Sequence, residues 1–189
     1  KGDIFFGPTV SRRYLAHKAY NYSTGFMIET GYDITRQLNA KLTLSYTPTY
    51  YDDYPDILNG DTKSARLRLF YALDSSKYLI FKTGYEYEKT KDRTYTNDRI
   101  NFALGFGAEL PYGFHVYAEP SVLFTNYKGE RWTVKDYKFE EIKERDVLQR
   151  YSISISNRNL SFWGMVPTLT YSYTDKSSNI WQREYEKSL

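Results

Sequence analysis

Residues 98–110 read DRINFALGFGAEL, and this stretch decides the fold class. Apolar side chains occupy every second position: Ile100, Phe102, Leu104, Phe106, Ala108 and Leu110. The positions between them hold small or polar residues: Asn101, Ala103, Gly105, Gly107 and Glu109. Successive side chains of a β-strand point to opposite sides of the sheet. The stretch therefore predicts a strand with one apolar face and one small or polar face.

The same period of two recurs along most of the chain. It is clear over 41–50, 64–73, 79–88, 114–125 and 163–174, and weaker over 4–14, 23–34 and 146–157, with a last strand beginning near Trp181. No stretch of comparable length shows the 3.6-residue period of a helix. We therefore predict an all-β chain of about ten strands.

Composition separates the possible classes of membrane and soluble protein. Aromatic residues make up 19% of the 189 residues, yet no uncharged apolar run approaches the ~18 residues that a membrane-spanning helix needs. A transmembrane β-barrel remains consistent, because its alternating strands average to a hydrophilic composition. A net charge of +3 without a Lys/Arg block gives no reason to expect nucleic acid as a partner. The absence of cysteine excludes a disulfide scaffold and a thiol nucleophile.

The predicted connections alternate in length. Short links fall at 34–38, 74–77, 111–113 and 158–160, and longer polar links at 15–22, 52–61, 89–97, 127–145 and 175–180. Outer-membrane barrels have short periplasmic turns and longer outside loops. The pattern predicts an antiparallel transmembrane β-barrel of the bacterial outer membrane, although the strands of a soluble sandwich or a lipid-binding barrel also alternate.

Tyrosine and tryptophan gather near the predicted strand ends. These positions are Tyr14, Tyr20, Tyr50, Tyr51, Tyr54, Tyr85, Tyr87, Tyr127, Tyr171, Tyr173 and Trp181. Rings with a polar tip favour the interface between lipid and water. We therefore expect an interfacial aromatic girdle.

Charged residues of both signs fall on the predicted inward face. The candidate lumen charges are Lys41, Arg66, Arg68, Lys82, Glu86, Glu109, Glu119 and Arg150. One interpretation is a network of ion pairs that supports the wall. The other is a polar lumen that contacts or passes a hydrophilic cargo. The residue pattern leaves both open.

The sequence offers little material for catalysis or metal binding. Its two histidines, His17 and His115, have no neighbouring groups that would form a catalytic dyad, so we expect no enzymatic activity and no cofactor. The acidic loop 52–61 could bind calcium through its oxygen atoms, or it is an ordinary solvated loop. The charged segment 128–146 is a candidate cargo or lid loop.

Scattered motifs near the C-terminal end resemble those of a known family. The positions are Asn157, Arg158, Gly164, Pro167, Tyr171, Tyr173, Ser178 and Asn179, with Gly164 and Pro167 expected in the penultimate strand. The run LPYGF at 110–114 is similar to an LPWG turn of the same family. Together they resemble the C-terminal barrel of the surface lipoprotein assembly modulator (Slam) family, most clearly over about the last 80 residues.

The resemblance implies a fold and a function. It implies that 1–189 is the C-terminal portion of a fourteen-stranded barrel, with the first strands and a helical periplasmic region upstream of this sequence. It also implies an outer-membrane translocator that delivers lipoproteins or related proteins to the cell surface. The partners would be outer-membrane lipid, a protein cargo and the barrel-assembly machinery. A passive, porin-like channel for a small hydrophilic solute and an adhesive barrel are the alternatives.

Overall fold

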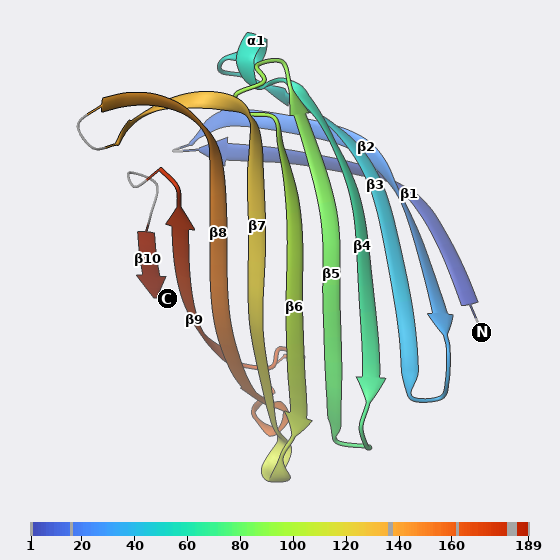
Figure 1. The fold of residues 1–189 in the computed structure, drawn as a ribbon. Helices are drawn as coiled ribbons and strands as arrows, with labels where there is room; N and C mark the ends of the chain where they lie inside the picture. The colour runs from blue at the N-terminus through green and yellow to red at the C-terminus, as the bar shows by residue number, and fades with distance from the viewer. Residues whose placement is uncertain (1, 16, 136–137, 162, 181–184, 189) are drawn as a thin grey trace.

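The computed structural model describes residues 2–15, 17–135, 138–161, 163–180 and 185–188. Their strands form one antiparallel sheet. The sheet has ten strands in chain order. They are β1 (Gly2–Leu15), β2 (Lys18–Asp33), β3 (Leu38–Tyr51), β4 (Gly60–Ala72), β5 (Lys77–Thr90), β6 (Asn97–Glu109), β7 (Phe114–Lys135), β8 (Lys138–Asn157), β9 (Thr168–Ser178) and β10 (Tyr185–Ser188). Figure 1 shows the sheet curved into an open trough whose two edges are β1 and β10.

Among the described residues, helical structure is confined to short connecting segments. These are α1 (Pro55–Leu58), η1 (Pro111–Gly113) and η2 (Arg158–Leu160). In the part of the chain that the structure describes, no helix has the length and apolar character needed to cross a membrane.

The convex face of the sheet carries the apolar side chains that the alternation predicted. Leu104 is 52% exposed, whereas its neighbour Ala103, on the opposite face, is buried. Other exposed apolar side chains of the same kind are Ile28, Leu44, Phe81, Phe102, Phe106 and Ile153. So large an apolar surface is unfavourable in water and is suited to lipid. The predicted all-β antiparallel architecture is confirmed.

The concave face is polar, and its strands are tied by side-chain hydrogen bonds as well as by the backbone ladder. The hydroxyls of Ser45 and Ser64 lie 2.6 Å apart on directly paired positions of β3 and β4. The ring of Tyr78 on β5 covers Gly107, its partner on β6, where an added Cβ would lie 2.1 Å from the ring. Glycine is needed there because the aromatic ring occupies the space of a side chain.

Three of the predicted long links are wrong, and two of them belong to hairpins of the sheet. The expected loop 15–22 is instead a tight turn between β1 and β2, with His17 in the left-handed region at φ 67°. Most of 127–145 belongs to β7 and β8, which pair as far as Lys135 and Lys138. Strand pairing satisfies the backbone whatever the polarity of the side chains, so charged residues can continue a hairpin beyond the lipid-facing region. Figure 1 shows both strands bending sharply at their upper ends.

The predicted strand 163–174 and the short link 158–160 are also wrong in their bounds. The strand β9 begins only at Thr168, and residues 158–167 form one longer connection. Trp163 and Gly164 have φ values of 51° and 76°, which no strand accommodates. The strand then continues to Ser178, through much of the predicted link 175–180. The predicted strand start at Trp181 lies outside the described residues.

Candidate functional site

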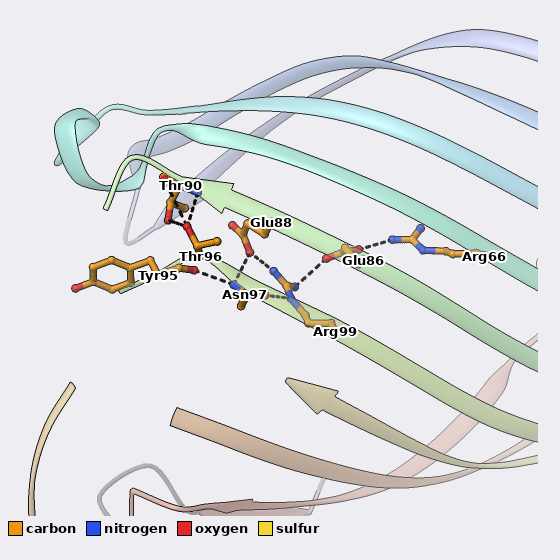
Figure 2. Close-up of polar contacts among 8 residues, drawn as sticks. All are labelled: Arg66, Glu86, Glu88, Thr90, Tyr95, Thr96, Asn97 and Arg99. Atoms are coloured by element: carbon orange, nitrogen blue, oxygen red, sulfur yellow. Dashed lines mark hydrogen bonds and ion pairs between the residues drawn. The ribbon is translucent and has the colours of Figure 1, made fainter. Parts of the chain in front are cut away.

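Four of the inward charges form a continuous chain across β4, β5 and β6. A guanidinium nitrogen of Arg66 lies 3.0 Å from Glu86, which also lies 3.0 Å from Arg99. Arg99 in turn forms an ion pair with Glu88. Its Nε–H also donates a hydrogen bond to the side-chain oxygen of Asn97 at 2.8 Å. Figure 2 shows these contacts linking Arg66, Glu86, Arg99 and Glu88. Each carboxylate is therefore held between cationic or amide donors.

Most of the remaining predicted lumen charges are also partnered. Ion pairs join Lys41 to Glu29 at 2.6 Å, Lys82 to Glu119 at 2.6 Å and Glu109 to Arg158 at 2.7 Å. Arg150 donates to the hydroxyl of Thr174 at 3.4 Å, and Arg68 forms no ion pair with a described residue. The ion pairs cross-link the wall, although Lys41, Arg68 and Lys82 also lie side by side as directly paired positions of β3, β4 and β5.

The positions that carry the family motif divide between the two ends of β8 and β9. At the lower end, Asn157 caps η2 by accepting from Asn159 at 2.8 Å, and both asparagines donate to the carbonyl of Tyr112. These bonds tie the segment that follows β8 to the turn at η1. The ion pair between Arg158 of η2 and Glu109, at the end of β6, adds to this contact.

At the upper end, Asn179 joins the end of β9 to β8. Its side chain accepts from the Arg145 backbone and donates to the Lys143 carbonyl, both at 2.8 Å, while Ser178 accepts from the amide of Ile180. Tyr171 is exposed on the convex face. Tyr173, paired in register with Tyr151, has its ring centroid 6.4 Å from that ring. Gly164 and Pro167 lie in the connection before β9, not in a strand, because Gly164 has positive φ. The structure therefore brings no single site together from these eight positions.

The acidic loop 52–61 does not converge on one point. Asp52 pairs with Arg12 at 3.1 Å, Asp56 pairs with Lys91 at 3.1 Å, and Asn59 accepts from the Tyr51 amide. Asp61 belongs to β4. Within the described ranges, no three His, Asp or Glu side chains are grouped so that they could hold a metal ion.

A cavity of about 640 Å³ lies on the concave face near the upper end of the sheet. Residues from β2 to β9 line it, and only the inside of the curved sheet can bring these strands to one space. Its aromatic and aliphatic lining consists of Tyr20, Tyr51, Tyr54, Tyr95, Tyr127, Ile57, Leu58, Leu123 and Leu148. Four of these tyrosines were expected in the interfacial girdle, and they face the lumen instead.

Two structural features build the upper wall of this cavity. The helix α1 follows Tyr54, which has positive φ, and supplies Ile57 and Leu58. The backbone of the 91–96 loop holds this segment, since Asp92 donates its amide to the Ile57 carbonyl at 3.0 Å. The pKa of the Asp92 carboxyl is lowered, chiefly because it accepts from the Thr94 amide.

An arginine joins the β7–β8 hairpin to the same wall. The guanidinium of Arg131 lies 4.9 Å from the ring centroids of both Tyr95 and Tyr127, and it donates to the Thr94 carbonyl at 3.3 Å. It also forms an ion pair with Glu144. Cation–π and ionic contacts of this kind are strongest when water is excluded.

Sequence reasoning missed the cavity and the arginine cluster. The available signal was Leu123 and Leu148, two leucines that are paired with each other at inward positions of β7 and β8. No sequence signal pairs Arg131 with Tyr95, because their contact depends on a β-bulge between Asn126 and Glu130, where the strand bends.

The fold and its two faces define the class of protein: this is the wall of an outer-membrane β-barrel. The β domain of the Bordetella autotransporter BrkA has a similar fold, with a TM-score of 0.50 and 16% identity over 99% of this chain and 82% of that one. The sequence model of the surface lipoprotein assembly modifier family matches residues 1–188. The chain therefore belongs to that family, as its motifs predicted.

Curated relatives show how much of a longer protein the chain represents. It is 28% identical over 176 residues to surface lipoprotein assembly modifier 1 of Haemophilus influenzae, covering 92% of this chain and 34% of that protein. It is 23% identical over 173 residues to a surface lipoprotein assembly modifier of Pasteurella multocida, covering 89% and 34%. The chain thus spans about a third of the length of these relatives.

Proposed function

We propose that this sheet forms part of an outer-membrane translocator that delivers lipoproteins to the cell surface. Membership of the surface lipoprotein assembly modifier family is the observation that carries the proposal. The architecture supports it, because the convex face suits lipid while the concave face offers a hydrated, hydrogen-bonded path. In this proposal the motif residues have a structural role: Asn157 and Arg158 hold the segment after β8 against the turn at η1, and Asn179 holds the end of β9 against β8.

The end of the sheet that holds α1 and the β7–β8 hairpin faces outward in this proposal. Outside loops and hairpins of outer-membrane barrels are the longer ones, and the hairpin is the longest extension of the described sheet. The lower end, with the 34–37 and 73–76 turns, then faces the periplasm. We propose further that preceding strands complete a fourteen-stranded barrel attached to a helical periplasmic region.

Surface proteomics of a deletion strain tests the proposal. Cells lacking the full-length protein are treated with protease, and the released peptides are identified by mass spectrometry. We expect particular lipoproteins to disappear from the surface while remaining in the cell, and to return when the full-length gene is restored.

An unchanged surface would overturn the proposal. Electrical conductance of the purified full-length protein in a planar bilayer would then decide the alternative. Steady conductance would indicate a passive channel for a small hydrophilic solute, and its absence would leave an adhesive role for the outer loops.

A further inference from the structure

The cavity at the upper end of the concave face gathers tyrosine rings and leucine side chains around one space. The middle of the face is lined chiefly by charged residues, and near its lower end Tyr78 packs against Phe70 and Tyr117. We propose that this cavity binds apolar side chains of an unfolded polypeptide segment as it passes along the lumen. The inference rests on the translocator function proposed above and names the part of the cargo that the wall recognises.

The charged groups that line the cavity are paired with one another. Glu88 is paired with Arg99, and one oxygen of Asp146 is paired with Lys176 at 2.7 Å. A ligand ion would compete with these pairs, whereas the other oxygen of Asp146, buried without a hydrogen-bond partner among the described residues, is available to a neutral N–H group such as a peptide amide. A neutral, amphipathic ligand leaves the pairs intact.

The lining groups suit side chains of a polypeptide. Tyr20 and Tyr51 meet edge to face, with ring centroids 5.3 Å apart, and both line the cavity. Tyrosine supplies a large, rigid and amphipathic contact area at low entropic cost. The leucines Leu123 and Leu148, paired across β7 and β8, add an aliphatic surface. A ligand with mobile apolar side chains on a polar backbone matches both kinds of group.

The place of the cavity in the sheet also favours a passing chain. Its lining reaches from Tyr20 on β2 to Lys176 on β9, so it extends across the inside of the trough. It adjoins α1 and the foot of the β7–β8 hairpin, at the end through which the cargo leaves in the proposed orientation. A segment leaving there would pass the tyrosines.

Site-specific photo-crosslinking in living cells tests which molecule occupies the cavity. A benzoylphenylalanine replaces Leu123 in the full-length protein, and the matched control carries it at Phe124, the next residue, which is exposed on the convex face. We expect polypeptide adducts, identified by mass spectrometry, from position 123 and none from position 124. Lipopolysaccharide as the only adduct at position 123, or no adduct there, would overturn the inference.

Peptide binding to the purified full-length protein in lipid nanodiscs gives a second readout. The probes are two fluorescent Gly/Ser peptides, one with two tryptophans and one with serine in their place. We expect the tryptophan peptide to bind about tenfold more tightly, and the double variant Leu123→Asn, Leu148→Asn to remove that preference. Heat-modifiable migration in gel electrophoresis confirms that the variant is folded.

The two proposals fail separately. Equal affinity for both peptides would overturn the cavity inference while leaving the surface-delivery function standing on the deletion experiment. A deletion strain with an unchanged surface would overturn the function even if the peptides are discriminated.

Discussion

The Nε atom of Arg131 lies 3.1 Å from a carboxylate oxygen of Glu144, whose side chain has no exposed surface. Only 11% of the arginine side chain is exposed. The pair joins β7 to β8 just beyond the bulge at 126–130, where the hairpin leaves the line of the wall. A buried pair at this point fixes the direction of the hairpin, because separating the ions would take the Arg131 guanidinium away from a fully buried carboxylate.

Replacing Glu144 by glutamine should loosen the hairpin. The change removes one partner of a buried pair, which costs about 3–5 kcal/mol. Hydrogen exchange of the 130–143 amides in the full-length protein should therefore become faster, while exchange in β5 and β6 stays unchanged. The control is Asp56→Asn, which breaks the exposed pair with Lys91 and should change little. Equal protection in Glu144→Gln and the native protein would contradict the role of the pair.

The substitution Gly129→Ala should separate β7 from the 91–96 loop. An added Cβ would lie 2.4 Å from the Thr94 Cα, so the backbone of one segment must move. We expect faster amide exchange in the 91–96 loop and a loss of thermal stability. At Gly31 an added Cβ would lie 3.5 Å from Asp3, an ordinary contact, so Gly31→Ala serves as the matched control. If the two variants behave alike, close approach at Gly129 is not what requires glycine.

Arginine should be tolerated on one face of β6 and not on the other. Leu104→Arg places a charge on the lipid-facing side of the strand, with an expected cost of about 2–4 kcal/mol near the bilayer midplane. Asn101→Arg introduces the same residue on the concave face, beside a polar cavity that is lined by acidic residues (Glu86, Glu119) and basic residues (Arg66, Lys82, Arg99, Arg150). Urea-dependent unfolding from lipid vesicles measures both. A similar loss of stability in the two variants would contradict the assignment of the convex face to lipid.

The turn between β4 and β5 should depend on pH through Asp74. Its carboxylate accepts from the Ser76 hydroxyl and amide and from the Lys77 amide, and these bonds lower its pKa below the ordinary value of 3.8. The group therefore stabilises the turn above pH 3.8, and this contribution is lost as pH falls through the lowered pKa. A carboxyl titration by NMR should show a midpoint below 3.8. In Asp74→Ala the turn should lose its protection at every pH, whereas Asp74→Asn keeps an acceptor oxygen.

The reach of sequence reasoning is clearest in the central strands. In β4, β5 and β6 the alternation places Leu69, Phe81 and Leu104 on the convex side, and the register pairs Phe81 directly with both leucines. Prediction from the sequence failed at the ends of the hairpins. Charged residues between Tyr127 and Arg145 predicted a loop, although pairing between strands had already satisfied their backbone groups.

The candidate site shows the same division. The mixed charges of the inward face predicted ion pairs as one interpretation, and contacts such as Lys82 with Glu119 agree with it. The interpretation of Tyr20, Tyr51, Tyr54 and Tyr127 as a girdle was wrong, because a ring near a strand end suits either face and only the register and curvature decide which.

The sequence by itself determined the all-β architecture, the two chemically different faces and the family, because side-chain period and short motifs are local properties of the chain. The tertiary structure alone decided the lengths of the β7–β8 and β1–β2 hairpins, the burial of Glu144 against Arg131, and the tyrosine-lined cavity. Each of these depends on contacts between residues far apart in the sequence, and the curvature of the sheet sets their distances. Local alternation contains no measure of that curvature.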